Sequence, residues 1–301
     1  MEASRVTTRQ QTWPLAGARQ VLSDYVELTK PRVQSLLLLT TITTMYVAGD
    51  PSLGLVALTC LGGSLSAGGA GAVNHWFDRD IDAQMARTAN RPVPAGRIAP
   101  NAALIFGIVL AALSFVQLSL TVNVLSASLA FAGFLGYVLV YTVWLKRSTP
   151  QNIVIGGAAG AVPPLVGWAA VTGHLDPTAL YLFAIVFYWT PPHFWALSLL
   201  MKDEYARVGV PMMPVVHGEA ETRRQILLYT CLLVVLTLLP VVFGFFGALY
   251  AAVAVVLGAA FLIHAVRLQR SAERRAALKT YLFSLLYLAL LFVAMVADTR
   301  L

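Results

Sequence analysis

Charged side chains are scarce in this sequence of 301 residues, since Asp, Glu, Lys and Arg together make up only 12% of it. Soluble domains carry about 25% charged and roughly 45–50% apolar residues, whereas 58% of this chain is hydrophobic. So few polar side chains cannot cover a surface that faces water, which excludes a water-soluble globular protein. No stretch between the hydrophobic runs is long enough for a separate soluble domain.

Cysteine is almost absent. Cys60 and Cys231 both lie inside apolar runs and form neither a CxxC pair nor a cluster with histidine. A disulfide scaffold and a cysteine-based zinc site are therefore not expected, and both residues fit small packing positions.

The first thirty residues also lack the apolar core of a cleavable signal peptide, and they carry cations instead. We expect a polar cytoplasmic tail over residues 1–24 and a membrane-surface segment around Val21–Leu28. A polytopic membrane domain should occupy residues 25–301.

Long hydrophobic runs are abundant. A helix that crosses a bilayer needs about 20 mainly apolar residues, and nine such runs predict an all-α integral membrane protein with nine transmembrane helices. Their ranges are about 32–49, 52–74, 101–119, 122–141, 151–172, 177–200, 224–244, 247–268 and 278–297. Prolines at 163–164, 191–192 and 240 should kink three of them.

The cations indicate the orientation. In the nine-span arrangement, 20 of the 21 Lys and Arg residues fall on one side and only Arg300 on the other. Cytoplasmic loops carry such an excess, so the N-terminus should be cytoplasmic, the C-terminus on the opposite side and the protein in the cell membrane. The net charge of +7 is then explained by topology, and no nucleic-acid partner is expected. Two long loops, 75–100 and 201–223, share the cytoplasmic side.

The most informative segment lies at the end of the second predicted span. Asn74, Asp78 and Asp82 recur at four-residue spacing, which places three oxygen-bearing side chains on one helix face over about 12 Å. Like charges at this spacing repel, and an uncompensated carboxylate near hydrocarbon is costly. Mg²⁺ takes oxygen ligands, commonly one or two carboxylates plus substrate phosphates. The spacing therefore predicts a catalytic magnesium site with Asn74, Asp78 and Asp82 as ligands.

The competing interpretation is a solvated acidic helix end with salt bridges to Arg79 and Arg87. It suits the membrane boundary poorly, because Arg87–Pro92 (RTANRP) follows and arginine binds phosphate oxygens in a bidentate fork. Asp80 points about 200° away from Asp78 and is expected to pair with an arginine or with water.

The string Asn74–Asp82 (NHWFDRDID) resembles the NxxxDxxxD signature of the UbiA superfamily of intramembrane prenyltransferases. Within it, the chain is similar to the branch that farnesylates protohaem IX, over about residues 25–297. This likeness is carried further by Arg87–Pro92, by Leu28–Arg32 (LTKPR), by Tyr188–Leu197 (YWTPPHFWAL) and by Tyr205–Val216. The string Tyr188–Leu197 is not shared by quinone or chlorophyll prenyltransferases, so the likeness is specific.

One departure concerns the second aspartate-rich motif that many superfamily members carry between the sixth and seventh spans. Here Lys202-Asp203-Glu204-Tyr205 is followed by no further acid until Glu219. Two metal ions, or one metal assisted by Lys202 and arginines, both stay open. The diphosphate-binding set predicted with this resemblance is Lys30, Arg32, Arg79, Arg87, Arg91, Lys202 and Tyr205.

The resemblance implies transfer of a farnesyl group from farnesyl diphosphate to the 2-vinyl group of haem B, with addition of water to give haem O for terminal oxidases. Mg²⁺ would be the cofactor and the bilayer the surroundings, and downstream partners would be a haem A synthase or oxidase assembly factors. The residues suit this chemistry, because cations can neutralise a diphosphate leaving group and hydrocarbon walls can shelter an allylic cation from water.

Histidines offer contacts for the haem. His193 could ligate or position its iron, or it could pack between helices through a carbonyl freed by the preceding prolines, and both interpretations stay open. His75 and His217 flank the two long loops; a surface role is favoured for both over contact with a haem propionate. His174 and His264 are given no chemistry.

Two other functions compete. Within the same fold, the acceptor could be an aromatic quinone precursor or a chlorin. A transporter could use Asp78 and Asp82 for ion coupling, but transporter acids commonly lie near the membrane midplane in broken helices, whereas these lie at a helix end beside an arginine-rich loop.

Overall fold

The computed structural model describes residues 17–271 and 273–301, which form helices and connecting turns without any strand. Arg5 and Arg9, in the predicted tail, lie outside these residues. The helices are α1 (Ala18–Leu28), α2 (Pro31–Ala48), α3 (Leu53–Phe77), α4 (Arg79–Asp82), α5 (Pro100–Thr121), α6 (Val124–Leu135), the π-helix η1 (Gly136–Leu145), α7 (Asn152–Gly160), α8 (Val162–Thr172), α9 (Pro177–Leu200), α10 (Lys202–Arg207), α11 (Met213–Val216), α12 (Gly218–Val242), α13 (Ala248–Arg270) and α14 (Arg274–Asp298).

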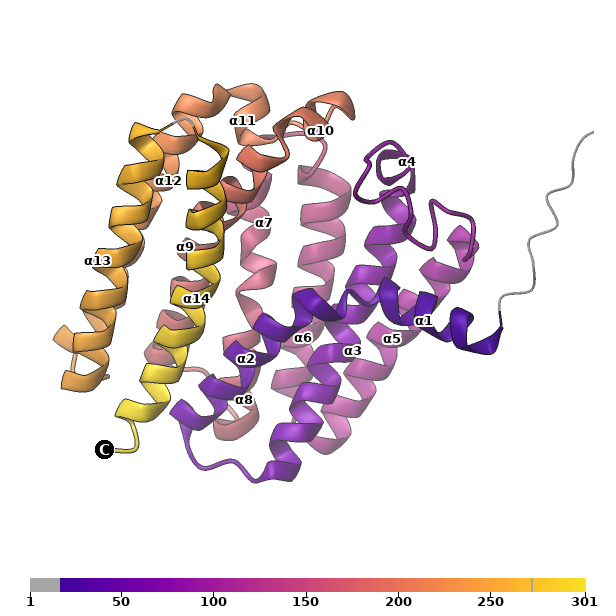
Figure 1. The fold of residues 1–301 in the computed structure, drawn as a ribbon. Helices are drawn as coiled ribbons and strands as arrows, with labels where there is room; N and C mark the ends of the chain where they lie inside the picture. The colour runs from indigo at the N-terminus through magenta and orange to yellow at the C-terminus, as the bar shows by residue number, and fades with distance from the viewer. Residues whose placement is uncertain (1–16, 272) are drawn as a thin grey trace, which may run out of the picture.

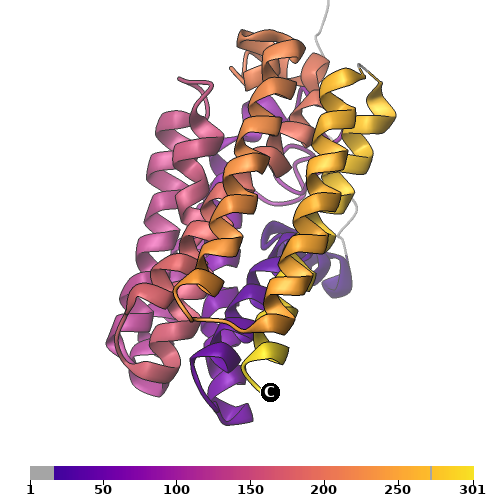
Figure 2. The same ribbon diagram turned by 90° about the vertical axis from the view of Figure 1, so that its left-hand side faces the viewer.

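The long helices stand side by side in one bundle (Figures 1 and 2). The short helices α4, α10 and α11 lie together at one end of it, which we call the loop end, and the C-terminus lies at the opposite end. Both long loops therefore share one end, as the distribution of cations predicts. That this end faces the cytoplasm stays a prediction.

Among the described residues, seven helical segments are long and apolar enough to cross a membrane: α3, α5, α6 with η1, α7 with α8, α12, α13 and α14. The other two predicted spans, α2 and α9, are also helices of 18 and 24 residues, but they are less apolar. Many of their polar side chains face the interior: Gln34 and four threonines of α2 are buried, and so are Thr190, His193 and Ser198 of α9. Seven of the nine predicted spans are thus both long enough and apolar enough to cross a membrane.

Three helix boundaries differ from prediction by four to six residues. The fourth span continues to Leu145 as a π-helix, α12 begins at Gly218 rather than near residue 224, and α14 begins at Arg274 rather than near residue 278. The fifth span is interrupted at Ala161, next to its two prolines, because proline cannot donate the helical hydrogen bond. The prolines of α9 and α12 lie inside continuous helices.

Glycine brings α3 and α5 into direct backbone contact. A Cβ atom added to Gly107 would lie 2.7 Å from the carbonyl oxygen of Gly69, and one added to Gly69 would lie 2.6 Å from that of Gly107. Small residues allow such close approach between membrane helices. This crossing fixes α3, whose loop end carries Asn74.

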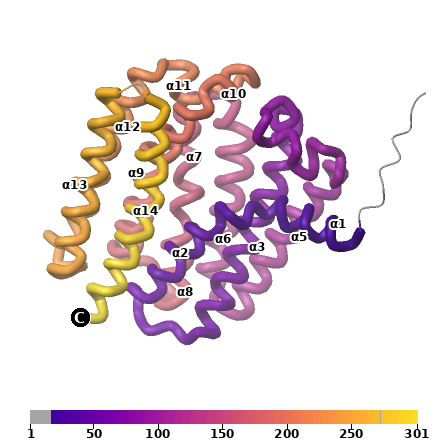
Figure 3. Tube along the Cα trace, viewed as in Figure 1, coloured from indigo at the N-terminus to yellow at the C-terminus, as the bar shows by residue number. Residues whose placement is uncertain are grey.

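Helix α1 lies across the side of the bundle rather than along it (Figures 1 and 3). Val21, Leu22 and Val26 are exposed, whereas Asp24 is buried and accepts a 2.9 Å hydrogen bond from Nε of Arg97. An apolar outer face with a polar inner contact suits a helix at a membrane surface, in line with the predicted segment Val21–Leu28. The ion pair ties α1 to the loop that follows α4.

Candidate functional site

The candidate site is built on the loop end of α3. Asn74, Asp78 and Asp82 are all buried, with at most 3% of each exposed. Helical hydrogen bonds continue through the segment, because the Asp78 amide donates to the Asn74 carbonyl at 2.9 Å and the Asp82 amide to the Asp78 carbonyl at 2.8 Å. The structure therefore stacks the three side chains, although α3 formally ends at Phe77.

Each buried carboxylate already faces a cation. Lys146 pairs with Asp78, and Nη1 of Arg91 lies 2.7 Å from Oδ2 of Asp82. Asn74 joins the set, because its amide donates to Oδ2 of Asp78 at 2.7 Å and its oxygen accepts from Lys30. Both acids are buried and each has a cationic partner, so the solvated helix end is not what the structure shows for these two residues.

Asp80 behaves differently from its neighbours. Its side chain is 56% exposed, and Arg147 donates to both carboxylate oxygens at 2.7 Å. This bidentate pair lowers the pKa of the Asp80 carboxyl. The predicted pairing of Asp80 with an arginine is confirmed, and Asp80 lies outside the buried set.

Lys30 holds a backbone conformation that is unfavourable for any residue except glycine. Its φ and ψ angles are 54° and 55°, directly before α2. Gly71 makes room for this turn, because a Cβ there would lie 2.8 Å from the Leu28 carbonyl oxygen. Burial, with repulsion from Arg91 and Lys146, lowers the pKa of the Lys30 amine to about 7. Strain and desolvation concentrated on one lysine are typical of a functional site.

Replacing Lys30 should separate strain from function. The left-handed conformation costs a non-glycine residue roughly 1–2 kcal/mol, so Lys30→Gly should be more stable than Lys30→Met by about 1 kcal/mol. Both variants should lose about 10–100-fold in affinity for a prenyl diphosphate, because a charged hydrogen bond is lost. Thermal unfolding and ligand titration of the purified variants measure the two effects. Lys202→Met is the matched control; a loss equal to that of Lys30→Met would contradict the assignment.

Sequence reasoning missed the contribution of the fourth span. The π-helix η1 closes i→i+5 hydrogen bonds, such as the 2.8 Å bond from the Lys146 amide to the Tyr141 carbonyl. This spacing brings Tyr137, Thr142 and Lys146 to one side. The Thr142 hydroxyl accepts from Asn74 at 3.1 Å, and the Lys30 amine lies 5.9 Å from the Tyr137 ring centroid. The sequence does place Lys146 at the end of the fourth span, but we interpreted this lysine only as evidence for the orientation of the helices.

The other predicted diphosphate ligands divide into two groups. Arg91 reaches the site through its pair with Asp82. Tyr205 packs in the hydrophobic cluster that contains Ile81, next to Asp82, and burial raises the pKa of its phenol. Arg32 and Arg87 are exposed, and Arg79 turns back to donate to the Trp76 carbonyl at 2.6 Å. Among the described residues, none of these three arginines forms an ion pair with Asp78 or Asp82.

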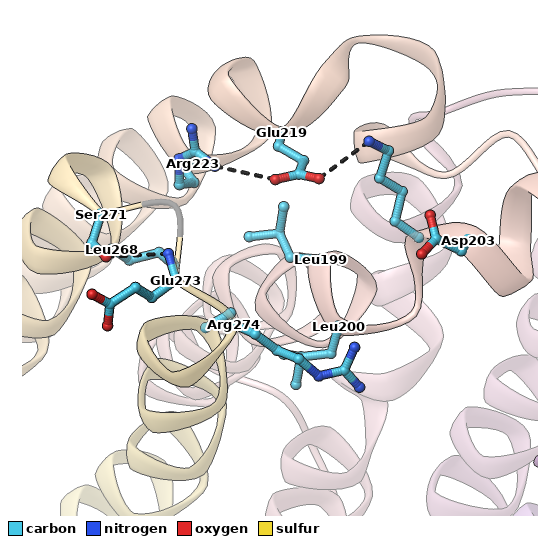
Figure 4. Close-up of a pocket in the computed structure, with 11 residues that line it drawn as sticks. Leu199, Leu200, Asp203, Glu219, Arg223, Leu268, Ser271, Glu273 and Arg274 are labelled. Atoms are coloured by element: carbon cyan, nitrogen blue, oxygen red, sulfur yellow. Dashed lines mark hydrogen bonds and ion pairs between the residues drawn. The ribbon is translucent and has the colours of Figure 1, made fainter.

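Lys202 belongs to a separate cavity of about 190 Å³ at the loop end, between α9, α12 and α14 (Figure 4). Its amine lies 3.1 Å from Glu219, which Arg223 also contacts at 3.4 Å. Three cations and three acids line this cavity, so it carries no net charge. The structure thus does not bring Lys202 to the aspartates, contrary to its place in the predicted set.

His193 is buried in the seam between α9 and α14. Its ring stacks on Trp189 and Tyr281, with centroids 4.2 and 4.9 Å away. Nδ1 lies 2.7 Å from Oγ of Ser284, whose hydroxyl donates to the Tyr281 carbonyl at 2.6 Å. Ser284 therefore accepts from Nδ1, which leaves the lone pair on Nε2. A carbonyl freed by proline is not the partner of Nδ1.

The surface role predicted for His75 is wrong, whereas the surface role predicted for His217 agrees with its exposed position. His75 is 1% exposed at the loop end of α3, because it shares the inward face of Gly71, whereas His217 is exposed before α12. The sequence alone could not separate them, since both adjoin a long loop.

The residues fit a divalent cation only with help from a substrate. Within residues 17–271 and 273–301, no group of three His, Cys, Asp or Glu side chains is placed to hold a metal ion. Two carboxylates are close by, and Oδ1 of Asp78 is buried without a hydrogen-bond partner among these residues. Mg²⁺ is commonly held by one or two carboxylates with phosphate and water oxygens, so this donor set suits it.

Solved structures share the fold. One, described as giving structural and mechanistic insights into the biosynthesis of digeranylgeranylglyceryl phosphate synthase in membranes, aligns over 94% of this chain and all of its own, with a TM-score of 0.77 and 20% identity. A UbiA homolog from Archaeoglobus fulgidus, bound to DMAPP and Mg²⁺, aligns over 90% of this chain and 99% of its own, with a TM-score of 0.66 and 17% identity.

Curated relatives are much closer in sequence. A protein named protoheme IX farnesyltransferase from Symbiobacterium thermophilum is 57% identical over 93% of this chain and 95% of its own length. One of the same name from Roseiflexus sp. (strain RS-1) is 56% identical over 94% of this chain, which spans only 54% of that longer relative. Residues 37–292 match the UbiA prenyltransferase family. The chain belongs to the UbiA prenyltransferase family.

Proposed function

We propose that this chain transfers a farnesyl group from farnesyl diphosphate to the 2-vinyl group of haem B and adds water, giving haem O. The observation that carries the proposal is the buried pair Asp78 and Asp82, set among Lys30, Arg91 and Lys146 at the mouth of a membrane bundle. The names of the curated relatives support haem as the acceptor.

The cations and acids divide the work at the diphosphate. Lys30, Arg91 and Lys146 would bind its oxygens and stabilise the charge that develops as the allylic carbon–oxygen bond breaks. Asp78 and Asp82 would hold Mg²⁺, with Asn74 bridging to Lys30. When bound, Mg²⁺ would neutralise the leaving group as a Lewis acid. The site would hold one or two Mg²⁺ ions.

The remaining steps need no protein nucleophile. The terminal vinyl carbon of haem would form the new carbon–carbon bond with the farnesyl carbon. A water oxygen would bond to the other vinyl carbon and release a proton, so the atoms of a hydroxyethylfarnesyl group are accounted for. The aromatic and aliphatic walls between the helices would exclude further water from the allylic cation.

His193 is the proposed haem contact. Nδ1 donates its proton in a hydrogen bond to the Ser284 hydroxyl, so Nε2 keeps its lone pair and can serve as a metal ligand. We expect His193→Ala to weaken haem B binding, measured by the Soret band, more than farnesyl diphosphate binding. Ser284→Ala should have a smaller effect of the same kind. An equal loss of both ligands would show that the ring serves helix packing instead.

We infer a cell-membrane protein with a cytoplasmic N-terminus and its loop end in the cytoplasm. There, farnesyl diphosphate can reach the site from water while its chain enters the bilayer. Haem O would pass to a haem A synthase or to oxidase assembly.

Mass spectrometry of haems tests the function directly. Membranes from a host without haem O, expressing this chain, should contain a haem heavier than haem B by one farnesyl group and one water. Purified protein should form the same product from haem B but none from 4-hydroxybenzoate. Prenylation of 4-hydroxybenzoate, with haem B unchanged, would replace haem by a quinone precursor as the acceptor.

A further inference from the structure

His75 is a buried polar residue for which the proposed function gives no role. Its side chain is 1% exposed, and neither ring nitrogen has a hydrogen-bond partner among the residues that the structure describes. Burying a polar group without a partner costs about 1–3 kcal/mol. Beside a binding site, an unpartnered buried group indicates where a ligand would supply the partner.

The position of the ring identifies the ligand's charge. Gly71, four residues earlier on α3, lies against Leu28 and Lys30, and helical periodicity puts His75 on that same face. Lys30 contacts Asn74, the residue before His75, while Lys146 and Arg91 pair with Asp78 and Asp82. An anion that these three cations bind would therefore lie beside the His75 ring.

We propose that His75 positions the diphosphate group of the prenyl donor. One ring nitrogen of the neutral imidazole accepts a hydrogen bond from a neighbouring cation, and the other donates to a diphosphate oxygen. The inference rests on the proposed function only for its donor, a prenyl diphosphate, and not for haem as the acceptor.

The choice of residue type follows from the surroundings. A neutral imidazole carries one donor and one acceptor, so it can stand between a cation and an anion and satisfy both. A lysine in its place would add a further positive charge to three that are already close. An aliphatic side chain would fill the volume but leave the diphosphate oxygen without its donor.

Ligand titration of the purified, Mg²⁺-loaded protein tests the proposal. The probes are farnesyl thiodiphosphate, which resists ionisation, and inorganic pyrophosphate. His75→Leu should weaken both by about 10–100-fold, the value of one hydrogen bond to a charged group, and leave haem B affinity unchanged. His75→Gln, which keeps a donor and an acceptor, should recover most of the loss.

His217→Leu, at an exposed histidine beside the other long loop, is the matched control and should match the wild type. Unchanged affinity for both probes in His75→Leu would overturn the proposal. So would a Gln variant as weak as the Leu variant, with a lowered melting temperature, since that pattern marks a packing role. Loss of haem B affinity alone would assign His75 to a propionate. If the wild type binds both probes but farnesylates no haem, the acceptor is wrong and the role of His75 stands.

Discussion

Asp78→Asn and Asp82→Asn should each lower haem O formation by at least about 10²-fold, a loss comparable to removing one preorganised charge partner from an active site. Both side chains are buried and paired with Lys146 and Arg91. An amide of the same shape keeps the packing but removes the charge that a divalent cation requires. Single-turnover farnesylation in membranes measures the effect.

Asp80→Asn is the control for this pair of variants. It lies two residues from both aspartates, yet its side chain is exposed and bound by Arg147, and exposed ion pairs contribute little. Its rate should stay within about 5-fold of the wild type. All three variants should run as folded protein in size-exclusion chromatography. Rates near wild type for Asp78→Asn and Asp82→Asn would remove the metal site.

Lys146→Met should have the second large effect, also at least about 10²-fold in turnover. Lys146 is the cation nearest to Asp78, and only 13% of its side chain is exposed. Its loss deprives the diphosphate of a donor and leaves Asp78 with Arg147, whose Nη2 is 3.5 Å from Oδ1. The measurements are single-turnover rate and affinity for farnesyl thiodiphosphate.

Arg147→Met provides the comparison, since it removes the next cation along the chain, which mainly serves exposed Asp80. We expect a loss below about 10-fold. Equal losses in the two variants would mean that the charge at this end of η1 matters in sum rather than at Lys146 in particular.

The helices could be predicted from sequence because lipid imposes one requirement on every span, a run of about 20 apolar residues. All nine predicted segments are helical in the structure, although α2 and α9 are less apolar than the others. Their polar residues face inward, which a count of hydropathy cannot register. The π-helix was not predicted either, because π-helices are rare and the apolar run Gly136–Leu145 has the composition of an ordinary spanning helix.

Local spacing found the acids, and contacts between distant helices decided the rest of the site. The stacking of Asn74 with Asp78 follows from helical periodicity alone. The approach of Lys30 depends on Gly71 and an unusual backbone turn, and that of Lys146 depends on η1. For Lys202, the sequence could not show that Glu219 would hold it in another cavity.

The internal pairing of Asp78 with Lys146 has a thermodynamic consequence for the order in which ligands load. Each partner neutralises the other, so a divalent ion arriving alone would leave the Lys146 ammonium without its carboxylate. A free pyrophosphate arriving alone would leave Asp78 with only the longer contact to Arg147. Both ligands together would leave each charge with a partner. Metal and pyrophosphate should therefore strengthen each other's binding by the same factor, as linkage demands, and a prenyl alcohol, which brings neither charge, should not open the pair.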